Sequence, residues 1–239
     1  IFLVLLLQVP VEAGVARTYY VSTTGGNIAP YTNWAMAARS IQDAVDEWKV
    51  NTDTVLVTDG VYTVSSQIVL DKWMTLRSVN GRTKSRIDSS GATRCLLVSH
   101  SNAVVDGFTI LGGNIPGSTG AGALVTAGTM QNCRFSGGSG SAGGGAFVGN
   151  GLVVNCTFSK NSAVSYGGGL YLTDGGVARD CVIATNQSLF DGGGAAVSGG
   201  RAERCVIERN SAVIGGGGAF LQFSGRLQDC VIGINTARM

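Results

Sequence analysis

A repeat with a period of about 24 residues constrains this chain more than any other feature of its sequence. Cysteines mark the repeat at spacings of 23, 25, 24 and 25 residues. A large apolar residue follows each cysteine by two positions, and an asparagine follows all but the first by five positions. The three columns are Cys133, Cys156, Cys181, Cys205 and Cys230; Phe135, Phe158, Ile183, Ile207 and Ile232; and Asn161, Asn186, Asn210 and Asn235.

Glycine runs recur at the same period and end at Gly145, Gly169, Gly194 and Gly218, each just before a short apolar strand. The chain has 37 glycines in 239 residues, about twice the average usage. Glycine within every unit excludes a solenoid of paired helices. Proline is scarce, with 3 residues, which excludes a collagen-like chain.

Each unit holds two or three short strands separated by turn residues, and none shows helical periodicity. A single unit cannot bury its apolar face, so the units have to stack on one another. Stacking brings equivalent residues of neighbouring coils to about 4.8 Å, the spacing of parallel strands. The sequence therefore predicts an all-β fold, a right-handed parallel β-helix (solenoid) with coils of about 24 residues.

Equivalent residues of stacked coils form ladders. Asparagine suits a turn ladder because its amide both donates and accepts, and because it tolerates a left-handed backbone. The cysteines share a strand face with the apolar residues two positions later, so both columns are predicted to point inward. We expect stacked free thiols, with disulfides between neighbouring coils as the alternative. The spacings lack the close CxxC pairs of a zinc site, and no metal or other cofactor is expected.

Charged residues stand one and two positions before several of these cysteines and alternate in sign from coil to coil. Arg179 precedes Glu203 in one column, and Asp180, Arg204 and Asp229 follow one another in the next. Stacking makes each charge a neighbour of an opposite charge, so the columns are predicted to form surface ion pairs. The alternative is a catalytic cluster of carboxylates and arginines.

The segment before the repeats has a different pattern. Ser40 to Asp43 resembles a capping box, and Ile41, Val45 and Trp48 follow at helical spacing. This predicts a short amphipathic helix over about residues 39–49 that caps the open end of the coils and shields its first strand edge. Early strands are expected at residues 54–57 and 74–76, before the regular coils open at residue 104.

The first seven residues form an apolar run that is followed by small-residue cleavage candidates, which is typical of a secretory signal. The run is too short for a transmembrane helix, so none is expected; a buried N-terminal strand is the alternative interpretation. We divide the chain into a signal-peptide remnant (1–16), an N-terminal cap with the first coils (17–103) and regular coils (104–239). We expect the last part to be truncated, since no terminal cap follows it.

Several segments resemble a known superfamily. Residues 19–22, 40–45, 53–57, 59–62 and 105–110 are similar to the N-terminal half of the bacterial right-handed β-helix repeat superfamily, which has the pectate-lyase-like fold. Residues 158–161 and 167–171 resemble repeats of polymorphic outer-membrane proteins and related adhesins. The resemblance implies the fold, whereas the superfamily includes polysaccharide lyases, glycosidases and adhesins, so it implies no single activity.

No residue is singled out as catalytic. A lyase of this fold is expected to use a lysine or arginine base near carboxylates, and no lysine here stands in a cluster of acids. A glycosidase needs two carboxylates on one face. Asp174 and Asp191 are the candidates, but both adjoin glycines, which favours a role in turns. The only histidine, His100, is also interpreted as a turn residue.

One column favours binding. In the strands after the glycine runs, Phe147, Tyr171 and Phe220 alternate with uniformly apolar residues that should face the core. In one interpretation the rings lie on the outer face, where flat aromatic surface suits packing against sugar rings. In the alternative interpretation the rings point inward and form a core stack.

These observations lead to a functional hypothesis. The chain is interpreted as a secreted or cell-surface bacterial protein that binds extended polysaccharide, or another cell-surface partner, and mediates adhesion. The alternative is a polysaccharide lyase or glycoside hydrolase whose catalytic coils lie beyond Met239. A net charge of +2 without any basic run gives no indication of nucleic acid as a partner.

Overall fold

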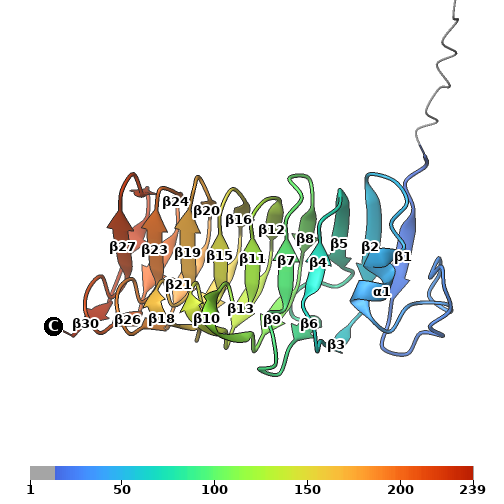
Figure 1. Ribbon diagram of the computed structural model, residues 1–239, viewed down its shortest axis with the longest axis horizontal. Helices are drawn as coiled ribbons and strands as arrows, with labels where there is room; N and C mark the ends of the chain where they lie inside the picture. The colour runs from blue at the N-terminus through green and yellow to red at the C-terminus, as the bar shows by residue number, and fades with distance from the viewer. Residues whose placement is uncertain (1–13, 239) are drawn as a thin grey trace, which may run out of the picture.

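The computed structural model describes residues 14–238, and almost all of its regular structure is β-strand. Thirty short strands wind into a solenoid whose coils lie side by side along one axis (Figure 1). Neighbouring strands of each sheet are paired in parallel. The parallel β-helix predicted from the repeat is therefore confirmed.

The strands form four sheets, A to D, and within each sheet they follow one another along the solenoid axis. Sheet A contains β1 Thr18–Val21, β2 Asp53–Val57, β5 Met74–Ser78, β8 Val104–Asp106, β12 Thr129–Gln131, β16 Leu152–Val154, β20 Val177–Arg179, β24 Arg201–Glu203 and β28 Arg226–Gln228. Sheet B contains β3 Gly60–Thr63, β6 Ser85–Asp88, β9 Thr109–Leu111, β13 Arg134–Ser136, β17 Thr157–Ser159, β21 Val182–Ala184, β25 Val206–Glu208 and β29 Val231–Ile232. Sheet C contains β4 Ile68–Leu70, β7 Leu96–Val98, β11 Ala123–Val125, β15 Ala146–Val148, β19 Leu170–Thr173, β23 Ala195–Ser198 and β27 Ala219–Gln222. Sheet D contains β10 Asn114–Thr119, β14 Ser139–Ala142, β18 Ser162–Tyr166, β22 Gln187–Ser188, β26 Ser211–Ala212 and β30 Thr236–Ala237.

Each regular coil passes through sheets A, B, D and C in that order, and the earlier coils lack a strand in sheet D. The register follows the sequence repeat without slippage in sheet B, where Phe135 pairs with Phe158 and Phe158 with Ile183. The glycine runs form the corners between sheets D and C. A Cβ at Gly144, for example, would lie 2.1 Å from the Ser162 carbonyl oxygen, so only glycine fits where successive corners stack this closely.

The core fills the centre of the solenoid with the inward columns of the sheets. The cysteine and Phe/Ile columns are buried there as predicted, except in the last coil, where Cys230 is partly exposed and Ile232 exposed. The rings of Phe135 and Phe158 stack face to face with centroids 4.6 Å apart and planes 5° from parallel. Ladder register therefore brings like side chains into direct contact, which is the physical reason for the repeated columns.

The single helix of the described residues, α1 (Ile41–Asp46), begins after the N-cap Ser40, whose hydroxyl accepts the backbone N–H of Asp43. It packs Ile41 and Val45 into the core against β1, β2 and β4. The helix is shorter than the 39–49 expected from periodicity. The buried carboxylate of Asp53 accepts the backbone N–H groups of Lys49 and Val50, at 2.9 and 3.2 Å, and this draws the chain away from helical geometry.

The N-terminal strand β1 pairs with β2 and forms the first edge of sheet A. The outer edge of β1 is bonded to the segment before the helix: the backbone N–H of Tyr20 donates to the Tyr31 carbonyl, and the N–H of Ala38 donates to the Tyr20 carbonyl. The helix itself packs against β1, β2 and β4 and, within the described range, does not bond to this edge. The proposed signal segment falls on residues 1–16, of which 1–13 lie outside the described residues.

Candidate functional site

The structure places the predicted aromatic column on the outer face of sheet C. Phe147 and Tyr171 are partly exposed and pair in register, while their neighbours in the same strands, such as Ala146 and Leu170, are fully buried. The two rings contact edge to face, with centroids 5.3 Å apart. Phe220 occupies the same column two coils further on. The inward core stack of these rings, which was the alternative, does not form.

A fourth ring completes this surface, and the sequence repeat did not reveal it. Tyr166 ends β18 in sheet D, and its ring centroid lies 6.0 Å from that of Tyr171 and 6.0 Å from that of Phe220. The column position between Tyr171 and Phe220 is Ala196, which is fully buried. We infer that the small side chain of Ala196 leaves room for the Tyr166 ring. We call Phe147, Tyr166, Tyr171 and Phe220 the aromatic row.

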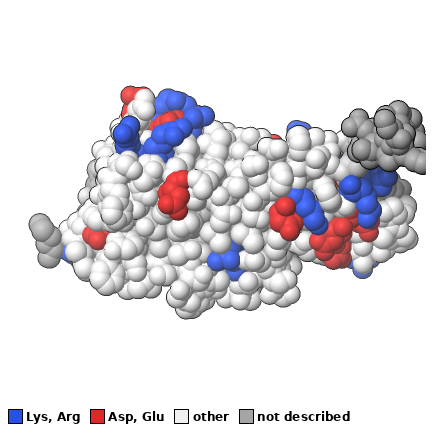
Figure 2. Space-filling view, turned by 45° about the horizontal axis from the view of Figure 1, so that its top comes forward, with Lys and Arg blue, Asp and Glu red and all other residues white. Residues whose placement is uncertain are grey.

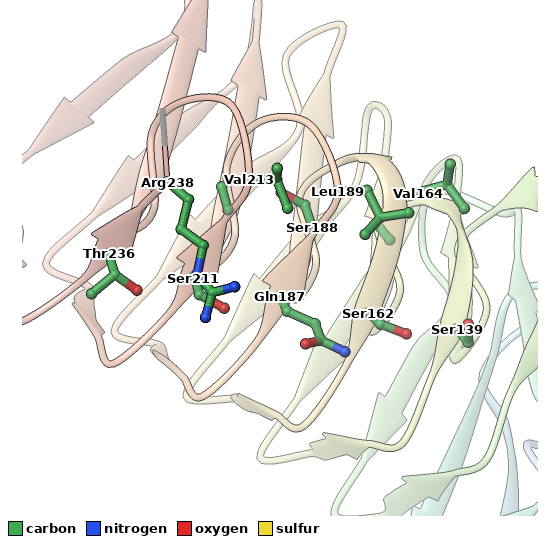
Figure 3. A pocket seen from close by; sticks show the side chains of 12 residues that line it. Ser139, Ser162, Val164, Gln187, Ser188, Leu189, Ser211, Val213, Thr236 and Arg238 are labelled. Carbon is green, nitrogen blue, oxygen red and sulfur yellow. The ribbon is translucent and has the colours of Figure 1, made fainter.

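A groove runs along the outer face of sheet D (Figure 3), the sheet in which Tyr166 of the aromatic row ends β18. It has a volume of about 440 Å³. A polar ladder forms one side of it, with one hydroxyl or amide side chain in each of five successive coils: Ser139, Ser162, Gln187, Ser211 and Thr236. Exposed apolar side chains form the other side: Val164, Leu189 and Val213.

Sequence reasoning missed this groove, although a signal for it was present. Each polar residue of the ladder directly follows a position of the asparagine column, as Ser162 follows Asn161 and Gln187 follows Asn186. Each exposed apolar residue stands three positions after the same asparagine, as Val164 and Leu189 do. The two columns are two residues apart, so they lie on the same outward face of sheet D.

The asparagine ladder lies directly beneath this groove and is structural. Asn161, Asn186 and Asn210 are buried, and each donates both its backbone N–H and its side-chain Nδ2 to the Oδ1 of the next asparagine, at 2.9–3.1 Å. The ladder ends on the partly exposed turn of Asn235. At its other end Gly138 takes the asparagine position, and its backbone N–H donates to Asn161 Oδ1 at 2.9 Å. These bonds hold the turns between sheets B and D in a fixed register.

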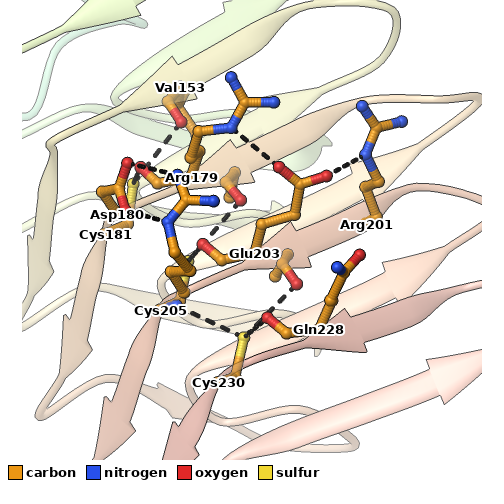
Figure 4. A network of polar contacts seen from close by, with 12 residues as sticks. Val153, Arg179, Asp180, Cys181, Arg201, Glu203, Cys205, Gln228 and Cys230 are labelled. Carbon is orange, nitrogen blue, oxygen red and sulfur yellow. Dashed lines mark hydrogen bonds and ion pairs between the residues drawn. The ribbon is translucent and has the colours of Figure 1, made fainter.

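The cysteine column forms a stack of free thiols on the inner side of the turn between sheets A and B (Figure 4). Each thiol donates to the carbonyl two residues before it, as Cys181 does to Arg179 at 3.2 Å and Cys205 to Glu203 at 3.3 Å. All six cysteines of the chain are free, so the expected stacked thiols are present and the alternative disulfides are not. Burial is the largest cause of the raised pKa of Cys156. The column therefore acts as small core residues.

The charged columns form ion pairs on the outer surface. Arg179 Nε lies 2.8 Å from Glu203 Oε2, and Arg201 contacts the other oxygen of the same carboxylate (Figure 4). Arg204 pairs with Asp180 at 2.8 Å. The predicted surface pairing is therefore confirmed for these residues, whereas Asp229 is not within ion-pair distance of any residue in the described range. In the view of Figure 2, charged side chains gather toward the two ends and leave a largely uncharged stretch between them.

The other sequence candidates lie in turns. Asp174 adopts a left-handed backbone with φ of 49°. Asp191 lies at a glycine corner, where its backbone forms an isolated β-bridge with Tyr166. The Nδ1 atom of His100 accepts the backbone N–H of Asn102 at 3.1 Å. Among residues 14–238, no three His, Cys, Asp or Glu side chains are grouped to hold a metal ion. No helix in this range has the length and apolar character needed to cross a membrane.

Comparison with known proteins bears on the fold. A family model described as the right-handed beta helix region matches residues 78–236. Pectate lyase Pel9A is 14% identical with a TM-score of 0.54, covering 95% of this chain and 80% of that chain. A pectin methylesterase from Aspergillus niger is 12% identical with a TM-score of 0.49, covering 91% and 88% of the two chains. A rhamnogalacturonan lyase is 12% identical with a TM-score of 0.49, covering 83% and 70%.

At 14% identity, the match to the pectate lyase shows a shared fold and nothing about activity. No curated protein matches the chain.

Proposed function

Because this chain belongs to the right-handed β-helix family, as the match over residues 78–236 shows, we propose that its solenoid is a scaffold that binds an extended polysaccharide outside the bacterial cell. The outer faces of sheets C and D form the binding surface in this proposal. Location outside the cell rests on the apolar run at the N-terminus, which is typical of export signals.

The observation that carries the proposal is the aromatic row. All four rings are partly exposed, and those of Phe147 and Tyr171 stand on strands whose inward side chains are packed into the core, which holds these two positions rigidly. Contacts at 5.3–6.0 Å between ring centroids link the four rings into one continuous surface. Aromatic faces pack well against the apolar C–H faces of sugar rings, and a rigid surface loses little conformational entropy when it binds.

The solenoid repeat matches the repeat of a linear polymer. Equivalent residues of successive coils are separated by about 4.8 Å along the axis, and a pyranose unit of an extended glycan advances by a comparable distance. A chain that runs parallel to the axis can therefore place one sugar against each coil. Both the aromatic row and the groove of sheet D extend in this direction.

The groove supplies the polar part of such a site. Five successive coils each present one hydroxyl or amide, and the chemistry changes little from Ser162 to Ser211. Sugar hydroxyls both donate and accept hydrogen bonds, as serine, threonine and glutamine side chains do. The exposed apolar side of the groove, with Val164 and Leu189, suits the less polar face of the same sugar chain. Arg238 takes the place of the apolar residue in the last coil and is the charged side chain of this lining. The proposal therefore favours a linear polysaccharide with little charge.

The variant Tyr171→Ala tests the proposal. A glycan array identifies a polysaccharide that the parent protein binds, and isothermal titration then measures its Kd for both proteins. Loss of one stacking ring should raise Kd roughly 10-fold, which corresponds to about 1.4 kcal/mol. Thermal unfolding should change little, because the ring leaves a partly exposed surface rather than the core.

Trp73→Ala is the matched control, since Trp73 is a partly exposed aromatic residue in the turn after β4, away from the aromatic row. Its Kd should equal that of the parent. The proposal fails if the parent protein binds no polysaccharide, or if the two variants weaken binding equally. A fall in melting temperature for Tyr171→Ala as large as that of a core deletion would also contradict it.

A further inference from the structure

A second hollow lies on the outer face of sheet B, in the early coils, with a volume of about 350 Å³. Arginine side chains dominate its lining: Arg82, Arg86 and Arg134. Three hydroxyl residues, Thr83, Thr109 and Ser136, and the apolar Leu111 complete the lining. A hollow with this lining attracts negative charge.

The β-helix register explains why these arginines converge. Arg86, Thr109 and Arg134 occupy one outward column on three successive coils. The two arginines are therefore about 10 Å apart along the axis, at two strand spacings. Thr109 between them is short and buried, so it leaves an open space that both long side chains can reach.

The third arginine comes from the connection between β5 and β6. The Thr109 hydroxyl donates to the carbonyl of Arg82 at 2.6 Å. Arg82 Nη1 in turn donates to the carbonyl of Asn155 at 3.0 Å, which ties this connection to a coil further along the solenoid. The Thr109 bond holds the backbone of Arg82 beside the column. Within residues 14–238 the bond to Asn155 is the one hydrogen bond of the Arg82 guanidinium, so its other N–H groups are free to bind a ligand.

These arginines carry charge that no nearby acid neutralises. Among residues 14–238, Arg82, Arg86 and Arg134 form no ion pair. By contrast, Arg179 and Arg201 on sheet A both form ion pairs with Glu203. Asp88 lies on the same outward face, in register with Leu111 and Ser136, and accepts the backbone N–H of Ser90. Asp106 accepts the amide of Asn132, and among the described residues neither acid is within ion-pair distance of the three arginines.

We infer that this hollow, which we call the arginine site, binds a tetrahedral oxyanion of the sulfate or phosphate type, either as the free ion or as an ester group on a larger molecule. A carboxylate has two oxygens in one plane, and a single bidentate guanidinium satisfies both. Here Arg86 and Arg134 line the hollow from the coils on either side of Thr109, and Arg82 lines it from the connection between β5 and β6, together with Thr83 and Ser136. An anion with three or four oxygens arranged in space can use all of these donors. This site lies on a different sheet from the aromatic row and does not depend on glycan binding there.

The experiment follows the arginine Nε–Hε resonances by NMR during titration at constant ionic strength. Separate titrations use sodium sulfate, sodium phosphate, glucose 6-sulfate, glucose 6-phosphate and sodium acetate. Arg86→Gln and Arg134→Gln are the test variants. Arg226→Gln is the matched control, because Arg226 is exposed on sheet A and also lacks an ion pair within the described range.

We expect sulfate, phosphate or their sugar esters to shift a small set of arginine resonances, and we expect these shifts to saturate at millimolar ligand concentrations. Each test variant should raise the Kd roughly 10-fold, and Arg226→Gln should leave the Kd unchanged. Tighter binding of the sugar esters identifies an ester group as the ligand, and tighter binding of the inorganic ions identifies the free ion. The inference is overturned if no resonance saturates, if acetate binds as tightly as sulfate and phosphate, or if the control variant weakens binding as much as the test variants.

Discussion

The asparagine ladder can be tested at its centre with Asn186→Ala. In the native protein the side-chain Oδ1 of Asn186 accepts both the backbone N–H and the Nδ2 of Asn161, each at 3.0 Å. Its own Nδ2 donates to the carbonyl of Phe158 at 2.9 Å and to Asn210 Oδ1 at 3.0 Å. The residue is 1% exposed, so water cannot replace these partners without opening the turn.

The loss of unfolding free energy in Asn186→Ala depends on which polar groups are left without a hydrogen-bond partner. The backbone N–H of Asn161 donates to Asn186 Oδ1 alone among the described residues, and a buried donor left unsatisfied costs about 1–3 kcal/mol. The Nδ2 of Asn161 keeps its bond to the Phe135 carbonyl, so losing its bond to Asn186 costs less than leaving the backbone N–H unsatisfied. The three remaining bonds contribute about 0.5–1.5 kcal/mol each, which brings the expected loss of unfolding free energy to roughly 3–7 kcal/mol.

Equilibrium unfolding in urea measures this loss from the shift in midpoint at constant slope. Asn235→Ala is the matched control, because Asn235 makes the same pair of contacts to Asn210 but lies on a partly exposed turn where water can take its place. We expect a loss of about 1 kcal/mol or less there. Equal losses in the two variants, or a loss below about 1 kcal/mol for Asn186→Ala, would refute the argument that the ladder holds the turns together.

Three further predictions concern the core, the thiols and the surface charges. Phe158→Ala removes a fully buried ring that stacks on Phe135, and should cost about 3–5 kcal/mol of unfolding free energy, well above the loss for the outward ring of the aromatic row. Burial raises the pKa of Cys95 to about 11 from an ordinary value of 9.0, so the folded state keeps this proton to higher pH than the unfolded state. The contribution of this thiol to the free energy of unfolding is therefore complete below pH 9.0 and disappears as the pH rises through about 11. Urea unfolding of the parent protein should show a fall of about 2–3 kcal/mol across that window, and Cys95→Ala should not show it. Glu203→Gln should lower the melting temperature slightly in dilute buffer and not at all in high salt, since its ion pairs with Arg179 and Arg201 lie at the surface; an effect that persists in high salt would contradict this.

Much of the fold could be predicted from the columns of the repeat. Cysteine and asparagine recur at one period, and stacking at that period places each residue beside its own equivalent. Strand alternation also put Phe147 and Tyr171 on the face opposite the uniformly apolar column, because successive side chains of a strand point in opposite directions. Only the structure showed that this face is the outer one. The end of the capping helix could not be predicted, since the buried carboxylate of Asp53 terminates it through contacts that leave no periodic trace.

The candidate site was predicted only in part, for a related reason. Tyr166 belongs to no repeated column, and its contact with Phe220 joins residues two coils apart across a glycine corner. The arginine site likewise depends on Arg82, which lies in a connection outside the repeat. The depth of the groove on sheet D also depends on how the corners of sheet D turn, and not on the identity of its columns alone.

The sequence by itself determined the coil length, the ladders and which strand residues share a face. These are properties of a periodic chain, in which each coil contacts only its neighbours and identical positions meet at one spacing. Tertiary structure decided how the residues outside the period pack against that frame. Tyr166 contacts Tyr171 and Phe220, and the Arg82 carbonyl accepts the Thr109 hydroxyl, because folded turns bring these residues together. Such contacts depend on the path of the backbone through a corner, which a one-dimensional repeat does not specify.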